Sequence, residues 1–196
     1  EKSLSEASID NLNMVLSNAF RMQRLLNELL DYSKVNFQTE DRMELPFAKI
    51  LSTAQKNLSM VIESSQAEFV IDDDIPNIYG HELLLIQLFQ NLISNSVKFK
   101  RPEVKPVITI EYVEDPDYQV FLFSDNGIGI PSQFRNQVFD LFQRLEVRSE
   151  DSGSGIGLAF CKRIIDKHEG YIKIVDINEI GTTFKFGLSK NKTSIV

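Results

Sequence analysis

The chain has 196 residues, of which 42% are hydrophobic and 25% are charged. This composition supplies enough apolar material for a buried core and excludes a wholly disordered chain. With 28 acidic and 21 basic residues, its formal net charge of -7 gives no overall attraction to the phosphate backbone of nucleic acids. A single cysteine, Cys161, excludes a disulfide framework and any metal site built from several thiolates.

The first predicted element is a long amphipathic helix over residues 8–35, a stretch without glycine or proline. Apolar or small residues recur there in alternating steps of three and four, which is a heptad pattern. We interpret this seam as a surface for a partner helix or a dimer, with packing on the chain's own domain as the alternative. The seam residues are Leu12, Val15, Ala19, Met22, Leu26 and Leu29.

After residue 42 the chain mixes short strands and helices without a strict βαβ repeat. Strands are predicted at residues 43–47, 68–72, 107–114, 118–124, 171–177 and 182–188. Helices are predicted at residues 48–64, 81–99, 131–142 and 155–169, with a polar, lid-like stretch at 146–154 and a turn at 178–181. The expected fold is of the α+β class, a two-layer α/β sandwich with a mixed sheet, preceded by the long helix.

The helix predicted at 81–99 has a polar stripe on an otherwise apolar surface. Asn91, Asn95 and Lys98 follow one another at i, i+4 and i+7, so they share one face. The stripe is either the solvent side of the helix or part of a ligand site.

Two glycine-rich segments follow. In the first, Asp125 ends an apolar strand, where it can accept a hydrogen bond from an amino group such as that of adenine. Gly127 and Gly129 allow the backbone that follows to approach a ligand closely and to adopt positive φ angles. An ordinary turn is the alternative. In the second, residues 153–158 open a helix, which exposes backbone N–H groups to a phosphate.

The second segment is neither of two familiar phosphate loops. Reading from Gly155, a Rossmann fingerprint would need a small residue where Phe160 stands. A Walker A loop would need a Lys and a Ser or Thr where Leu158 and Ala159 follow. A glycine-rich lid remains.

In this order and spacing the motifs resemble the sensor histidine kinase catalytic domain of the gyrase/Hsp90/MutL superfamily, which has the Bergerat-type ATP-binding fold. The N box corresponds to residues 91–99, the F box to 139–144, and the three glycine boxes to 125–130, 153–158 and 181–184. Residues 1–38 resemble part of the family's dimerisation and phosphotransfer hairpin, and 39–196 its ATP-binding domain.

The resemblance implies ATP and Mg²⁺ as cofactors. Asn95 would be the metal ligand, Asp125 would bind the adenine amino group, and Asn91, Lys98 and Arg144 would be the catalytic residues beside the phosphates. The implied nucleotide-binding residues are Asn91, Asn95, Lys98, Asp125, Gly127, Gly129, Ile130, Arg144, Gly153, Gly155, Ile156, Gly157, Leu158 and Thr183.

The implied reaction is transfer of the ATP γ-phosphoryl group to a histidine, for relay to the receiver domain of a response regulator. Hydrolysing members of the superfamily have a glutamate where this chain has Asn91, and a carboxamide cannot act as a general base. His81 and His168 both lie outside the family's acceptor motif, so we expect the acceptor histidine outside this chain. The alternatives are a degenerate nucleotide-binding module that signals by dimerising and an ATPase of the gyrase, Hsp90 or MutL type.

The resemblance also implies a homodimer through the N-terminal helix in the full-length protein. We expect no nucleic acid partner. No apolar run is long enough to span a bilayer, and the acidic start lacks the basic region of a signal peptide. We therefore expect a cytoplasmic fragment without direct membrane contact.

Overall fold

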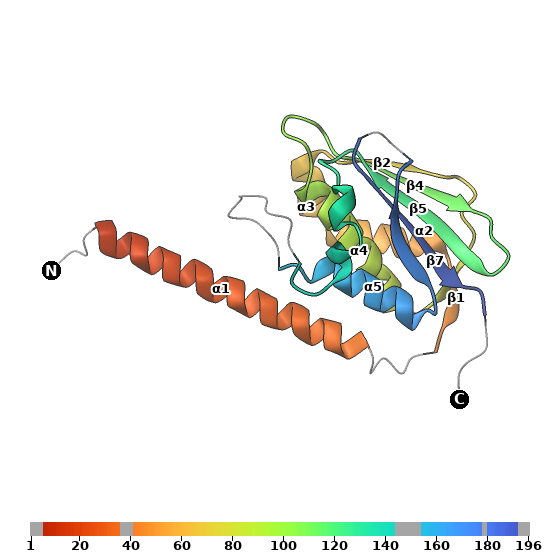
Figure 1. The fold of residues 1–196 in the computed structure, drawn as a ribbon, viewed down its shortest axis with the longest axis horizontal. Coiled ribbons are helices and arrows are strands. Elements are labelled where there is room, and N and C mark those ends of the chain that lie inside the picture. The colour runs from red at the N-terminus through yellow and green to blue at the C-terminus, as the bar shows by residue number, and fades with distance from the viewer. Residues whose placement is uncertain (1–5, 36–40, 144–153, 178–179, 192–196) are drawn as a thin grey trace.

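The computed structural model describes residues 6–35, 41–143, 154–177 and 180–191. A five-stranded sheet in the order β2-β4-β5-β7-β6 forms one layer, and helices α2, α4 and α5 lie against one of its faces (Figure 1). The strands are β2 (Glu68–Ile71), β4 (Val107–Val113), β5 (Tyr118–Asp125), β6 (Tyr171–Val175) and β7 (Thr182–Ser189). The helices are α1 (Glu6–Lys34), α2 (Phe47–Asn57), α3 (Ser59–Ser65), α4 (Glu82–Lys98) and α5 (Gly157–Lys167).

The sheet is mixed, as the sequence predicts. Strand β2 pairs in parallel with β4, whereas the β4–β5, β5–β7 and β6–β7 pairs are antiparallel. The β5–β7 register places Asp125 opposite Thr182 and Ser124 opposite Thr183. The end of β5 and the start of β7, which are far apart in the sequence, therefore lie side by side.

An aromatic cluster in the core fixes α4 against the sheet. The Phe121 ring of β5 stacks on Phe47 of α2 and on Phe186 of β7, with centroid distances of 5.8 and 5.2 Å. Phe89 of α4 packs edge-on to these rings. Offset and edge-to-face arrangements suit the charge distribution of aromatic rings. This packing holds the second half of α4 beside the end of β5.

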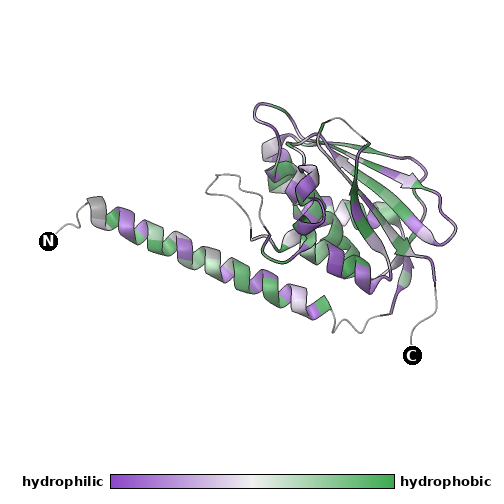
Figure 2. Ribbon diagram, viewed as in Figure 1, coloured by the Kyte–Doolittle hydropathy of each residue, from purple (hydrophilic) through white to green (hydrophobic). Residues whose placement is uncertain are grey.

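Helix α1 confirms the first predicted element and runs away from the sheet (Figure 1). Its C-terminal end contacts α5, because the Tyr32 ring lies 6.5 Å from Phe160 and 5.9 Å from the Arg163 guanidinium. Figure 2 shows hydrophobic residues interspersed with hydrophilic ones along the rest of the helix. All six seam residues are exposed, so the seam does not pack on the chain's own domain, and its partner remains a prediction.

The structure differs from the predicted elements in three details. The helix expected at 48–64 is two helices, because Leu58 has φ -108° and ψ 14° and donates its N–H to Gln55 O. The helix-like stretch at 131–142 is two 3-10 turns, Ser132–Phe134 and Gln137–Phe139, closed by short-range bonds from Phe134 N and Asp140 N.

The third difference is a second, two-stranded sheet, in which β1 (Met43–Leu45) pairs antiparallel with β3 (Ile78–Gly80). Strand β1 lies within the strand predicted at 43–47, whereas β3 was not predicted, because Ile78–Gly80 displays no alternating pattern. Most of the expected lid at 146–154 and part of the expected turn at 178–181 lie outside the described residues.

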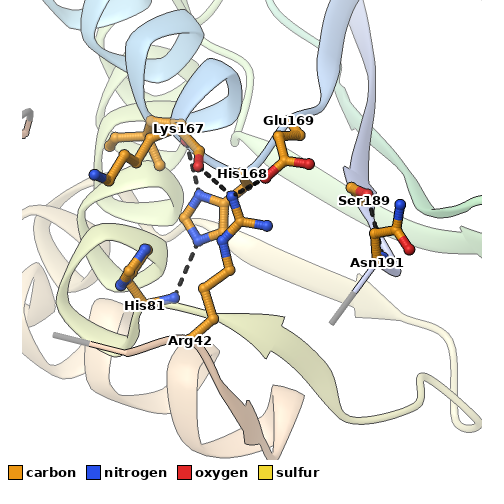
Figure 3. A network of polar contacts seen from close by, with 8 residues as sticks. Arg42, His81, Lys167, His168, Glu169, Ser189 and Asn191 are labelled. Atoms are coloured by element: carbon orange, nitrogen blue, oxygen red, sulfur yellow. Dashed lines mark hydrogen bonds and ion pairs between the residues drawn. The ribbon is translucent and has the colours of Figure 1, made fainter. Parts of the chain in front are cut away.

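A polar network with two buried histidines joins the start of β1 to the end of α5 (Figure 3). The Arg42 guanidinium donates to Lys167 O and pairs with Glu169 at 2.9 Å. The His168 ring accepts the backbone N–H of His81 on Nε2 at 3.0 Å, and its Nδ1 lies 2.7 Å from Ile164 O. The network fixes the C-terminal end of α5, the helix that begins in the second glycine box.

This network predicts a pH dependence of stability. Burial, together with the charges of His81, Arg42 and Lys167, lowers the pKa of His168 from 6.5 to about 4, although its hydrogen bond to Ile164 O acts in the opposite direction. Between pH 6.5 and about 4, His168 is protonated in the unfolded chain but neutral in the folded chain. Stability due to His168 is therefore fully present above pH 6.5 and is lost as the pH falls towards 4, by up to about 3 kcal/mol.

Urea unfolding between pH 7 and 4 tests this expectation. The variant His168→Gln cannot take up the proton, so its free energy of unfolding should fall less steeply over this range than that of the wild type. If the free energy of unfolding depends on pH equally steeply in the two proteins, the assignment to His168 is wrong.

Candidate nucleotide-binding site

The polar face of α4 contains the three predicted residues in its second half. Asn91 and Asn95 are partly buried, and Lys98 is exposed with its Nζ 5.0 Å from the Phe99 ring. The Asn91 amide donates to Gln87 O at 2.8 Å, which turns its Oδ1 away from the helix backbone. This oxygen is therefore available to the space beside α4.

The start of α5 lies against this face. A methyl group on Gly157 would come within 3.1 Å of Asn91 Oδ1 and 3.8 Å of Asn95 Nδ2. The N-terminus of α5 also presents backbone N–H groups and the positive end of the helix dipole. The structure thus brings the N box and the second glycine box together, with backbone N–H groups suited to phosphate on α5 and a carboxamide oxygen suited to a cation on α4.

Asp125 lies at the end of β5, partly buried and surrounded by donors. Its Oδ1 accepts the backbone N–H of Gly127 at 2.9 Å and of Thr182 at 3.3 Å, and its Oδ2 accepts the Ser96 hydroxyl at 3.3 Å. Burial raises the pKa of Asp125, while the bonds from Gly127, Thr182 and Ser96 lower it. Asp125 therefore links the first and third glycine boxes to α4.

The third glycine box approaches this strand so closely that position 181 admits only glycine. A Cβ there would lie 1.7 Å from Asp125 O, and Gly181 has φ +87°. Gly127 is nearly as confined, since its Cβ would lie 2.6 Å from Phe99 O. These contacts fix the backbone around the Asp125 carboxylate.

Ser124 and Asn126, the two neighbours of Asp125 in the chain, have structural roles. The Ser124 hydroxyl and the predicted site residue Thr183 are buried and 2.9 Å apart, so they join β5 to β7. Asn126 accepts Val107 N on its side-chain oxygen and donates to Lys105 O, both at 2.9 Å. The role of Asn126 was not predicted, because its partners lie 19 and 21 residues earlier in the chain and depend on the β4–β5 pairing.

The second glycine box is described from residue 154 onward. Gly155 has φ +75° and its carbonyl accepts Phe142 N at 3.0 Å, which joins the box to the end of the F box. The Ile156 side chain is buried, and Leu158 packs against the core. Arg144 and Gly153, two of the predicted site residues, lie outside the described residues.

A cavity of about 480 Å³ is lined by residues of the first and third glycine boxes, including Gly127 and Thr182, whose N–H groups bond Asp125. Of the predicted residues, Gly127, Gly129, Ile130 and Thr183 line it, whereas Asp125, the three residues of the amide face (Asn91, Asn95 and Lys98) and the described residues of the second glycine box do not. Two arginines that were not predicted also line the cavity: Arg101, which donates to Asn126 O, and Arg135, which pairs with Asp176. The predicted residues therefore form two groups, the cavity and the amide face of α4, connected through Asp125.

The amide face fits a Mg²⁺ ion that arrives with a nucleotide. Carboxamide oxygens are hard donors suited to Mg²⁺, which usually takes one or two protein ligands and completes its shell with phosphates and water. The described residues contain no cluster of three His, Cys, Asp or Glu side chains that could hold a metal by themselves. The protein donors are therefore too few for a resident ion but sufficient for one bound chiefly by phosphate.

Comparison with known proteins decides the family. Residues 80–192 match the family model described as histidine kinase-, DNA gyrase B-, and HSP90-like ATPase. The chain belongs to this family. The matched residues run from the end of β3 through β7, so they include the amide face, Asp125 and the described parts of all three glycine boxes.

Two curated relatives of this histidine kinase-like ATPase domain have names that include the word phytochrome. The chain is 36% identical over 187 residues to phytochrome-like protein Cph1 of Synechocystis, covering 95% of the chain and 25% of the relative. It is 41% identical over 165 residues to cyanobacterial phytochrome A of Nostoc, covering 84% and 21%. The chain thus spans a quarter or less of the length of these relatives.

A solved structure confirms the fold of the histidine kinase-like domain. The histidine kinase ThkA, crystallised in complex with the response regulator protein TrrA, superposes with a TM-score of 0.69 at 19% identity. The match covers 97% of this chain and 54% of that one.

Among the described residues, no helix is long and apolar enough to cross a membrane.

Proposed function

We propose that this chain is the ATP-binding catalytic part of a two-component histidine kinase, which transfers the γ-phosphoryl group of ATP to a histidine. Membership of the ATPase family supports ATP binding. The observation that carries the site assignment is the position of Asp125, which contacts α4 through Ser96 and the third glycine box through Thr182. One carboxylate thus joins a base-recognition cavity to a phosphate-binding face.

In this proposal adenine lies over the glycine boxes and donates its amino group to Asp125. The triphosphate lies between the amide face of α4 and the first turn of α5, where the N–H groups of the helix N-terminus face it. Asn95 would hold Mg²⁺, which supplies neutralisation of phosphate charge when bound, and Asn91 would line the same site. Lys98, together with Arg144, would contribute the protein's own positive charge.

Transfer to a side chain is favoured over transfer to water. The Asn91 carboxamide cannot accept a proton from a water molecule, and its own N–H is engaged with Gln87 O. The chain's contribution is then the orientation of the γ-phosphoryl group and the stabilisation of its charge, as in other phosphoryl-transfer enzymes.

We further propose that residues 1–38 belong to a dimerisation and phosphotransfer hairpin and 39–196 to the catalytic domain. The exposed seam of α1 supports a helical partner, because Val15 and Leu26 are 64% and 61% exposed, whereas Tyr32 near the end of the helix contacts Phe160 of α5. The complex in which ThkA was crystallised supports a response regulator receiver domain as the downstream partner.

Asn95→Ala tests the proposed metal ligand. The variant should bind ATP more weakly than the wild type when Mg²⁺ is present and about equally when Mg²⁺ is chelated, because only the metal contact is removed. Calorimetric titrations under both conditions measure this difference. Ser94→Ala, an exposed position on the same helix, is the matched control and should bind like the wild type. Equal Mg²⁺ dependence in Asn95→Ala and the control would overturn the metal-ligand assignment.

A further inference from the structure

We propose that Ser96 is a positioning residue for adenine recognition: its buried hydroxyl holds the Asp125 carboxylate in the orientation that accepts the amino group of the base. This inference rests on the proposed function, because it names a residue that sets the base preference of the same site. The motif comparison assigned roles to the neighbouring Asn95 and to Asp125 and none to Ser96.

The first observation is an isolated hydroxyl in an apolar environment. Helix α4, every residue of which the structure describes, has nine buried residues, and Ser96 is the polar one among them. It is 3% exposed. Serine is a poorer helix former than alanine, and a buried hydroxyl is costly unless it is hydrogen-bonded. Such a residue at this position calls for a specific partner.

That partner is the one oxygen of Asp125 that the backbone leaves open. Oδ1 accepts two backbone N–H groups, from Gly127 and Thr182, which fix one side of the carboxylate. Oδ2 has the Ser96 hydroxyl as its partner at 3.3 Å. A carboxylate oxygen has lone pairs for more than one donor, so Oδ2 can accept Ser96 and a base amino group together.

The competing arrangement is a bond within the helix. Ser96 Oγ also lies 3.1 Å from Leu92 O, and a helical serine commonly donates to the carbonyl four residues earlier. The hydroxyl has a single proton and can serve one strong bond at a time. A bond to an ionised carboxylate is stronger than one to a neutral carbonyl, which favours Asp125.

The hydrogen bond from Ser96 favours the ionised form of the buried Asp125 carboxylate. Burial disfavours the charged form of Asp125, and the Ser96 hydroxyl is the side-chain group that opposes this effect. An ionised carboxylate accepts on both oxygens, whereas a protonated one presents a donor towards the base. Ser96 therefore supports both the charge and the direction that an amino group requires.

The test compares two nucleotides in Ser96→Ala and wild type. ATP carries the amino group, and purine riboside triphosphate has hydrogen in its place. The variant should bind ATP about fivefold more weakly, the typical consequence of losing one hydrogen bond, and bind purine riboside triphosphate with unchanged affinity. In an Asp125→Asn background, Ser96→Ala should have no further effect on the ratio of the two affinities.

Ser189→Ala is the matched control, because Ser189 is also buried but lies opposite Tyr118 at the other end of the β5–β7 pair. It should leave both affinities unchanged. If Ser96→Ala weakens both nucleotides equally, or neither, while the wild type prefers ATP, the inference is wrong and the proposed function stands. If the wild type binds neither nucleotide, the proposed function itself fails, and the inference with it.

Discussion

Replacing Asp125 with alanine should lower the affinity for ATP by roughly tenfold to more than a hundredfold, the consequence of losing a hydrogen bond to a charged group. The carboxylate is held by Ser96 and by Gly127 and Thr182, two residues that line the cavity, so a base amino group that reaches it would meet a fixed acceptor. A guanine base has a carbonyl oxygen where adenine has this amino group. The wild type should therefore prefer ATP over GTP, and the variant should lose that preference.

Calorimetric titration of both proteins with ATP and GTP measures the effect. Asp73→Ala removes an exposed carboxylate from the turn after β2 and serves as the control for the change in net charge. Circular dichroism distinguishes loss of binding from loss of fold, because Asp125 also accepts two backbone N–H groups. A wild type that binds both nucleotides equally well would refute the role of Asp125 in base recognition.

The second large effect concerns the two histidines of this chain, neither of which should become phosphorylated on incubation with Mg²⁺ and ATP. His81 and His168 are 6% and 1% exposed, and both ring nitrogens of His168 lie at hydrogen-bonding distance from backbone groups. His81 precedes α4 by one residue, about 15 Å along the helix from Asn91. Phosphoryl transfer needs an acceptor in line with and close to the γ-phosphate.

Incubation with γ-labelled ATP, followed by mass-spectrometric mapping of acid-labile phosphate, tests this expectation. An acceptor helix carrying an exposed histidine, fused ahead of residue 1 or supplied as a separate segment, should restore labelling. The Asn95→Ala variant should reduce that labelling. Stable phosphate on His81 in the chain alone would overturn the acceptor argument.

The long, strongly periodic elements could be predicted from the sequence. Helices α1 and α4 and strand β5 begin and end within two residues of their expected bounds, because their apolar patterns extend over many residues. The break at Leu58 and the 3-10 turns after Pro131 could not. These depend on hydrogen bonds between near neighbours, from Leu58 N and Phe134 N, which the hydrophobic pattern does not encode.

The predicted site shows the same division. Asn91, Asn95 and Gly157 could be grouped from motif spacing, and the structure brings them together. Thr182 and Ser96 could not be assigned to Asp125, because their contacts depend on the β5–β7 register and on which face of α4 packs against the sheet. A serine at an apolar position of a buried helix was the available signal for Ser96.

The central claim is that one nucleotide site includes both the amide face of α4 and the glycine boxes around Asp125. Titration of the ¹⁵N-labelled chain with Mg²⁺ and ATP, followed by two-dimensional NMR, tests it most directly. The account predicts saturable shifts of the side-chain amides of Asn91 and Asn95 together with the backbone amides of Gly127, Gly129 and Gly157. Shifts confined to the arginine-lined wall of the cavity, at Arg101 and Arg135, with Asn91 and Asn95 unchanged, would contradict it.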